Sequence, residues 1–219
     1  MTRTRFVRWN GDWLEIEPEV AGVLNGWVLE DWEDDSLGWG RRFDDVPYAF
    51  DEPEDSEAVT TARVGWDVLA GDPIVSNNSL TLPGDATSGI ETPAPTTAGT
   101  WSFEFQFQTI SDGTGAFTPN IIREDTDNRW RISVIENGGL ELRYDEGGST
   151  STVVSSTWPV DTDPHTVSAV HDGDGNWELF FDGVSEGTET ETFMPSNPEI
   201  FAPINTADHD LDVTRIEVF

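Results

Sequence analysis

The chain has 219 residues and a formal net charge of −32, from 43 acidic and 11 basic side chains. No basic stripe is present to neutralise phosphates, which argues against a nucleic-acid partner, and no apolar run is long enough to insert across a bilayer. Cysteine is absent, so disulfides, thiolate metal sites and cysteine catalysis are excluded.

Every basic residue is an arginine, and lysine is missing altogether. In ordinary buffer such crowding of acidic charge opposes compaction. At about 1 M salt the screening length falls to about 3 Å, and the repulsion largely disappears. Ten Trp and twelve Phe supply a core, which favours a folded domain over a disordered acidic chain. We therefore predict a protein of an extreme halophile, or of a virus that infects one, working in high salt.

An N-terminal arm and acidic linker are predicted over residues 1–56. Two strand-like segments, Phe6–Trp9 and Trp13–Glu17, flank Asn10-Gly11, the preferred pair for a tight hairpin turn. The following segment, 30–57, is acidic and punctuated by proline and glycine, as expected of a long connection. The basic residues that open the chain are not followed by an apolar stretch, so we expect no export signal.

The main domain, residues 57–219, is predicted to be nearly all β, with a short helix only at residues 57–64. Trp101–Gln108 alternates between aromatic and polar residues, which predicts a central strand with one face on the core. Other strand patterns, with turn signals roughly every 8–12 residues, indicate a two-sheet antiparallel sandwich. These patterns cover 66–69, 74–76, 79–82, 117–122, 129–135, 140–144, 153–154, 166–171, 176–181, 200–204 and 211–219.

Several segments of the main domain carry a resemblance to a known family. Gly65–Pro73, with the hairpin at Asn77-Asn78, resembles the opening of concanavalin A-like, laminin-G-type jelly rolls. Asn176–Gly183 is similar to the late hairpin of that family, which ends in Asp-Gly, and Leu211–Val218 to its closing strand. The resemblance covers about residues 60–219 and implies a two-sheet jelly-roll sandwich. Such domains are often carbohydrate-binding, sometimes calcium-binding and sometimes purely adhesive.

Catalytic residues are not expected. The glucanase branch of this fold carries carboxylates that alternate along one strand, and retaining chemistry needs two carboxyl groups about 5 Å apart. No predicted strand has that pattern; Glu141, Asp145 and Glu146 are predicted to straddle a turn. We therefore expect no enzyme activity.

A weak calcium motif lies in a predicted hairpin turn. Asp172, Asp174 and Asn176 have the oxygen spacing of calcium-binding loops. Tight turns favour the same residue types without any metal, and the closing glutamate of an EF-hand loop is missing. The expectation is therefore no cofactor, with calcium at this turn as the alternative.

Tryptophans in the acidic segment provide a candidate sugar-binding surface. Trp27, Trp32 and Trp39 lie in a loop-rich region, where exposed rings beside carboxylates grip sugars through CH–π contacts and hydrogen bonds. The competing interpretation, which we favour, is that these rings anchor the arm onto the sandwich.

The arm is also the predicted oligomer or attachment element. Its hairpin presents edge strands that pair readily with another chain, and its aromatic and basic residues suit contact with an acidic neighbour. The residues assigned to this role are Arg3, Arg5, Arg8, Trp9 and Trp13. A homo-oligomer, or assembly with other virion proteins, is expected.

These features predict a non-catalytic structural or adhesion protein. A lectin-like sandwich without an export signal suits a virion protein, exposed on the particle after host lysis. The sequence thus favours a capsid decoration, turret or tail protein of a haloarchaeal virus, located at the virion surface and contacting host surface glycans. The alternatives are a carbohydrate-binding module or glycoside-hydrolase-related protein of a halophile, and a domain of a secreted adhesin with an extracellular location.

Overall fold

The computed structural model describes residues 67–218 apart from 77–78, 85–86, 94–96, 111–112, 199 and 208. Nearer the N-terminus it describes the backbone of six short strands. Within these residues every regular element is a strand, and neighbouring strands are antiparallel. None of the described segments forms a helix that could span a membrane.

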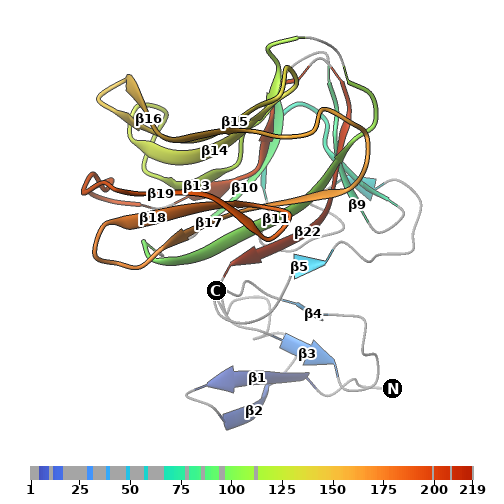
Figure 1. The fold of residues 1–219 in the computed structure, drawn as a ribbon. Coiled ribbons are helices and arrows are strands. Elements are labelled where there is room, and N and C mark those ends of the chain that lie inside the picture. The colour runs from blue at the N-terminus through green and yellow to red at the C-terminus, as the bar shows by residue number, and fades with distance from the viewer. Residues whose placement is uncertain are drawn as a thin grey trace.

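Two large sheets form the sandwich, with the front sheet drawn above the back sheet in Figure 1. In spatial order the front sheet contains β12 (Ala116–Phe117), β21 (Ile204–Asn205), β10 (Ser88–Pro93), β20 (Ile200–Ala202), β13 (Asn120–Arg123), β14 (Arg129–Ile135), β15 (Gly139–Glu146) and β16 (Ser149–Thr157), and β7 (Asp67–Ala70) pairs with β10. The back sheet contains β19 (Val184–Thr190), β18 (Asn176–Phe181), β17 (His165–His171), β11 (Gly99–Phe107), β22 (Leu211–Val218), β9 (Ser79–Leu82), β8 (Ile74–Ser76) and β6 (Glu57–Ala58), and β5 (Tyr48–Ala49) pairs with β22.

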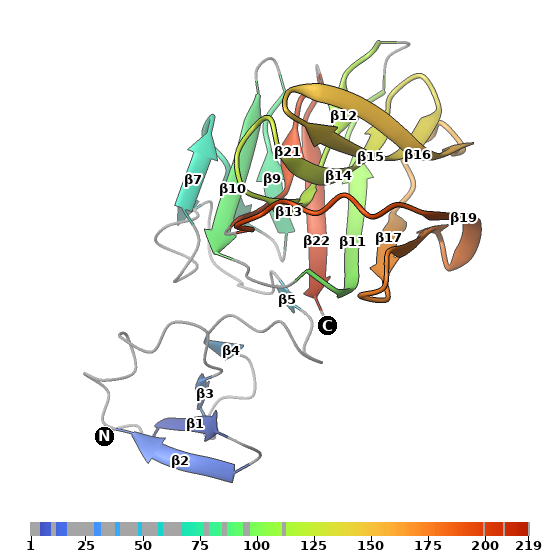
Figure 2. The same ribbon diagram turned by 90° about the vertical axis from the view of Figure 1, so that its left-hand side faces the viewer.

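The core lies between these sheets and is dominated by aromatic rings. On β11 the aromatic residues are buried and the polar residues between them are half-buried, so the predicted central strand is confirmed. This strand lies between β17 and β22, beside which it is drawn in Figure 2. Across the core Trp130 of the front sheet stacks on Trp177 of the back sheet, with ring centroids 3.9 Å apart. Each such ring removes about 150–250 Å² from water, which drives the two sheets together.

The predicted N-terminal hairpin is confirmed by the backbone. β1 (Arg5–Trp9) pairs with β2 (Asp12–Ile16), and Trp9 opposite Asp12 leaves a two-residue connection. β1 also pairs with β3 (Leu29–Asp31), which pairs with β4 (Gly38–Trp39).

Three details differ from the sequence-based expectation. The helix predicted over 57–64 is wrong where the structure describes it, because Glu57–Ala58 is a strand paired with β8. The strand predicted at 153–154 extends over all of β16. β19 was not predicted at all; it follows a two-residue turn in which Asp182 and Gly183 both have positive φ. Both missed regions lie at sheet edges, where serine and threonine replace the apolar alternation of a core strand.

Candidate functional site

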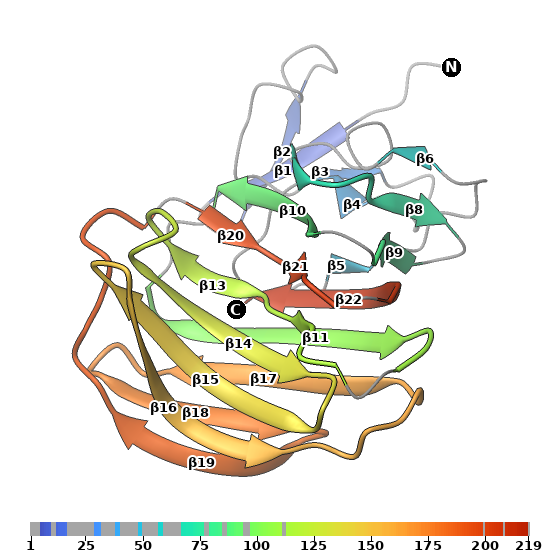
Figure 3. The same ribbon diagram turned by 90° about the horizontal axis from the view of Figure 1, so that it is seen from above.

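The outer surface of the front sheet carries a dense group of polar side chains. On β14 the core takes Trp130, Ile132 and Val134, so the alternate residues point to the opposite face. The register places residues of β13 and β15 directly beside them. Figure 3, seen from above, shows β13 to β16 without another element drawn across them. We call this surface the polar face; it comprises Glu91, Asn120, Arg123, Arg129, Arg131, Ser133, Glu141, Arg143, Asp145 and Thr150.

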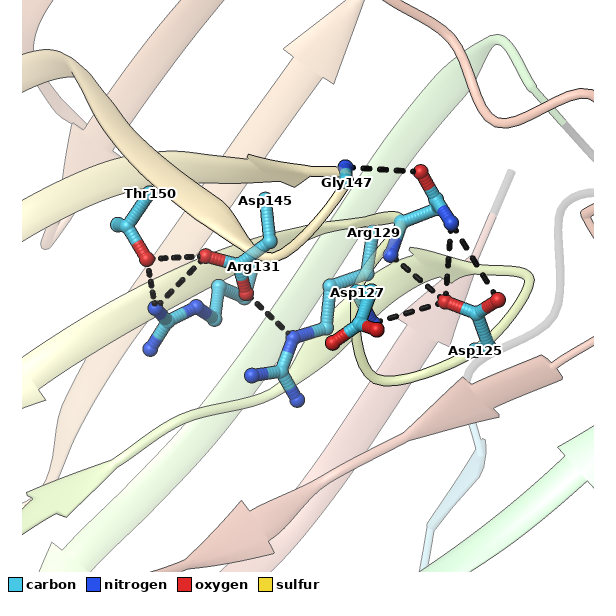
Figure 4. Close-up of polar contacts among 8 residues, drawn as sticks. Asp125, Asp127, Arg129, Arg131, Asp145, Gly147 and Thr150 are labelled. Carbon is cyan, nitrogen blue, oxygen red and sulfur yellow. Dashed lines mark hydrogen bonds and ion pairs between the residues drawn. The ribbon is translucent and has the colours of Figure 1, made fainter.

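Asp145 holds one end of the polar face together. Its carboxylate is 4% exposed and accepts a hydrogen bond from Arg129 Nε at 2.6 Å and one from Arg131 Nη2 at 3.2 Å. The Thr150 hydroxyl also donates to it, as Figure 4 shows. Burial alone would raise the pKa of Asp145, but the hydrogen bonds from Thr150, Arg129 and Arg131 outweigh burial and lower it. The carboxylate is therefore ionised and fixes both guanidinium groups.

A loop next to this end is fixed by its own hydrogen bonds (Figure 4). Asp125 Oδ1 accepts from the backbone N–H groups of Asp127 and Asn128, both at 2.8 Å. The hydrogen bond from the Asp127 N–H is the main cause of the lowered pKa of Asp125. Asn128 in turn accepts from the Gly147 N–H at 3.2 Å, which ties the loop to the β15–β16 turn. These hydrogen bonds of Asp125 and Asn128 therefore fix the loop at this edge of the polar face.

Other parts of the polar face contain buried polar atoms without hydrogen-bond partners in the part of the chain that the structure describes. Asn120 and Ser133 are each 1% exposed, and neither the amide atoms of Asn120 nor the Ser133 hydroxyl has a partner. The Nε–H groups of Arg131 and Arg143 are also buried and have no hydrogen-bond partner there. A buried polar group left unpaired generally costs about 1–3 kcal/mol. A group of them on one surface is the arrangement expected of a site that a polar ligand completes.

Positive charge is concentrated on the polar face. Of the five arginines whose side chains are described, four lie there and only Arg215 lies elsewhere. These four guanidinium groups face the carboxylates of Glu91 on β10 and of Glu141 and Asp145 on β15, and Asp125 in the neighbouring loop also attracts Arg123. The polar face therefore gathers most of the described arginine side chains in a chain whose formal net charge is −32.

Arg143 occupies the middle of this charged group. It forms an ion pair with Glu141 of its own strand. Burial, followed by repulsion from Arg131, lowers the pKa of Arg143. The two residues are direct neighbours in the register of β14 and β15, and attraction by Asp145 opposes the repulsion between them.

The carboxylates are arranged differently from the expectation. Glu141, Asp145 and Glu146 were predicted to straddle a turn, but all three belong to β15, and Glu141 and Asp145 share its outer face with Arg143 between them. Four residues of strand separate the two carboxylates by about 13 Å along the chain, whereas retaining and inverting glycosidases need about 5–5.5 Å and 6.5–9.5 Å. An arginine stands between them, and the pKa of Asp145 is lowered, opposite to what a general acid needs.

In the predicted calcium-binding turn, the motif residues form hydrogen bonds with one another. Asp172 Oδ1 accepts from the N–H groups of Asp174 and Asn176, and Oδ2 accepts from the Asn176 amide at 2.6 Å. The hydrogen bond from the Asn176 side chain is the main reason why the pKa of Asp172 is lowered. Across the described residues no three His, Cys, Asp or Glu side chains are grouped so as to hold a metal ion.

The side chains of two of the three histidines contact neighbouring residues of the sandwich. His165 lies between Asp161 and Asp182, with each ring nitrogen 2.8 Å from a carboxylate oxygen. His171 stacks on Trp177 with ring centroids 4.3 Å apart, and its Nδ1 contacts the carbonyl oxygen of Thr97. They lie at the two ends of β17.

The remaining predicted site residues stay predictions. Trp27, Trp32 and Arg3 lie outside the described residues, and for Trp39, Arg5, Arg8, Trp9 and Trp13 only the backbone is described. The sequence-based reasoning did not identify the polar face. One signal was available, because the strand pattern over 129–135 places Arg129, Arg131 and Ser133 opposite the core.

Solved structures share this architecture. The chain is similar to the carbohydrate-binding module CBM66 from Bacillus subtilis, with 16% identity, a TM-score of 0.59, and 70% of this chain and 94% of that one covered. It is similar to the exoplasmic/lumenal domain of VIP36 in a Ca²⁺/Man3GlcNAc-bound form, with 12% identity, a TM-score of 0.57, and 70% and 84% covered. The Crh5 transglycosylase is a third, with 15% identity, a TM-score of 0.57, and 80% and 84% covered.

These likenesses define the class of fold. The protein is an all-β, two-sheet jelly roll of the concanavalin-like, lectin-like type, as the sequence predicted. At such low identity they establish the fold alone, and both binding domains and enzymes are among the similar structures. Neither the models of known protein families nor the sequences of curated proteins match this chain.

Proposed function

We propose that the protein is a non-catalytic carbohydrate-binding domain and that the polar face of the front sheet is its binding surface. The observation that carries this proposal is the set of buried, unpartnered polar atoms on Asn120, Ser133, Arg131 and Arg143. Sugars present hydroxyl groups that donate and accept hydrogen bonds, so a bound glycan supplies the missing partners. The similar structures that bind carbohydrate support the same reading.

The test is glycan binding in molar salt by matched variants. Ser133→Ala is expected to bind at least about tenfold more weakly, because the buried Ser133 hydroxyl has no partner within the described residues and the bound glycan supplies one. Its stability should hardly change, since no hydrogen bond within the protein is lost. Ser168→Ala is the control: its hydroxyl lies on the back sheet and bonds Ser102 at 3.0 Å. Binding that survives Ser133→Ala, or an array on which no glycan binds, contradicts the proposal.

We propose that the domain does not hydrolyse the glycan it binds. The separation of Glu141 and Asp145 along β15 and the arginine between them support this. Incubation with a panel of polysaccharides should release no reducing ends. Turnover that Glu141→Gln abolishes would contradict this part of the proposal. The VIP36 structure contains Ca²⁺, but here the polar face supplies its own cationic groups, and we propose binding that is independent of calcium.

The setting in which the domain works is a separate proposal. We propose an exposed component of a haloarchaeal virion that contacts host surface glycans and assembles through the arm. The acidic, lysine-free composition supports the high-salt setting, and the β1–β2 hairpin supplies pairing edges for assembly. Labelling with an antibody against the protein should decorate purified particles. Detection only in culture supernatant, free of particles, would favour a secreted module instead.

A further inference from the structure

We propose that the glycan bound by the polar face is anionic, and that Arg131 and Arg143 contact its acidic groups. The chemical class is a polysaccharide that carries uronate carboxylates or sulfate esters. This inference rests on the proposed function, because it specifies the ligand of the same site. It is argued from the charge, the free donors and the side-chain types of the polar face.

Two neighbouring arginines favour an anionic ligand. Arg131 and Arg143 are direct neighbours in the register of β14 and β15. An anionic group placed between the two guanidinium groups relieves their repulsion. A neutral sugar would leave that repulsion in place.

The unpartnered donors of Arg131 and Arg143 also favour an anionic ligand. Arg131 uses Nη2 for Asp145 and Thr150, and Arg143 uses Nη2 for Glu141. In both residues the Nε–H group is buried and has no partner in the described structure. Charge-assisted hydrogen bonds from guanidinium N–H groups to carboxylate and sulfate oxygens are about twice as strong as neutral ones. Free arginine donors therefore fit an oxyanion better than a hydroxyl group.

Among the described residues, the polar face carries no exposed aromatic side chain. Within the described part of the chain the exposed large hydrophobic side chains are Val68, Val160 and Val184. None of these belongs to the polar face, so the CH–π contact that commonly holds neutral sugar rings has no described partner there. Recognition then depends on hydrogen bonds and charge.

High salt does not remove this interaction. At about 1 M salt the screening length is about 3 Å, which suppresses attraction between separated surface charges. Arg131 is only 16% exposed, and a hydrogen-bonded anion would lie in direct contact with it. Buried or partly buried pairs are screened much less than exposed ones. Direct contact between an arginine and an anionic group of the glycan therefore stays favourable in high salt, whereas attraction between distant charges does not.

The experiment compares charged and neutralised forms of the same glycans. Oligogalacturonate and its methyl ester, and a sulfated galactan and its desulfated form, are titrated into the full-length protein in molar salt by calorimetry. The charged form of at least one pair is expected to bind at least about tenfold more tightly than its neutral form. This wild-type comparison does not depend on the folding of any variant.

Variants then locate the contact. Arg143→Gln is expected to lose about tenfold or more in affinity for the charged glycan and little for its neutral form. Arg215→Gln is the matched control: it pairs with Glu217 on the back sheet and is 47% exposed. Circular dichroism of each variant confirms folding.

The outcomes separate the two proposals. If the neutral forms bind as tightly as the charged forms and Ser133→Ala weakens both, the proposed function stands and the anionic inference is wrong. If Arg215→Gln weakens binding as much as Arg143→Gln does, the assignment to the polar face is wrong. If neither charged nor neutral glycans bind, both proposals fail.

Discussion

Asp145 is the residue whose loss we expect to damage the polar face most. It is almost fully buried and accepts hydrogen bonds from Arg129, Arg131 and Thr150. Removing one partner of a buried ion pair leaves the other charges desolvated and unpaired, which generally destabilises by about 3–5 kcal/mol. Arg129 and Arg131 are 22% and 16% exposed, so water partly compensates them. We therefore expect Asp145→Ala to cost about 3 kcal/mol, which lowers Tm by about 6–12 °C in a domain of this size.

Thermal unfolding followed by near-UV circular dichroism in molar salt measures this loss. Glu217→Ala is the matched control, because Glu217 accepts from Arg215 at 2.5 Å and that arginine is 47% exposed; surface pairs contribute about 0–1 kcal/mol. The difference between the two variants isolates the effect of burial. Equal losses in Asp145→Ala and Glu217→Ala would refute the reasoning.

The pH dependence of the same variant gives an independent check. The pKa of Asp145 is lowered in the folded state, so its contribution is present above the unfolded pKa of about 3.9 and is lost as pH falls through the folded value. Asp145→Ala should therefore lose less stability on acidification than the wild type. A parallel decline of both proteins would show that Asp145 contributes no such linkage.

Further predictions concern salt, histidine, calcium and assembly. Because the net charge is −32, Tm should fall on dialysis from about 3 M to 0.1 M salt, and an unchanged melting curve would contradict the high-salt proposal. Burial opposes protonation of His165, but hydrogen bonds to Asp161 and Asp182 outweigh it and raise the pKa. The stability that protonated His165 contributes is therefore present below about pH 6.5 and is lost as pH rises through its folded-state pKa. His165→Gln should flatten this loss of stability, measured by urea titration at several pH values. An unaltered loss would contradict the role of His165. Chelation of calcium should leave Tm unchanged, because the Asp172 oxygens already accept N–H donors; a fall in Tm would indicate a bound ion. Deleting residues 1–50 should leave a folded sandwich that no longer assembles, as judged by sedimentation, and full-length protein that stays monomeric would contradict the assembly role.

The core strands were predictable because burial on one face imposes a visible alternation. The pattern of Trp101–Gln108 anticipated β11, and the segments 129–135 and 176–181 match β14 and β18 residue for residue. The edge strand β19 pairs with β18 only, and none of its residues is buried, so its sequence need not alternate. This is why Val184–Thr190 gave no strand signal.

The polar face was less predictable because it depends on pairing between strands. Alternation within one strand places Arg129 and Arg131 on the same side, but it does not say which residues lie opposite them. Asp145 meets both arginines only through the register of β14 with β15, and Asn120 reaches Arg131 through the register with β13. The end of β15 was predicted two residues too early, at Tyr144, which separated Asp145 from the strand that carries it.

The use of arginine instead of lysine and the position of the described arginines on the polar face have the same physical cause. Acidic side chains keep a protein hydrated in high salt, and surface cations add little there, because exposed pairs are screened. Arginine is retained where its planar, weakly hydrated guanidinium makes several hydrogen bonds at once in a partly buried site, which the compact and strongly hydrated lysine ammonium does poorly. Four of the five arginines with described side chains occupy partly buried sites on the polar face. Replacing Arg143 by lysine keeps the charge but loses the unpartnered Nε–H donor, so we expect Arg143→Lys to bind the charged glycan nearly as weakly as Arg143→Gln. Wild-type affinity in Arg143→Lys would mean that charge alone, rather than guanidinium geometry, decides recognition.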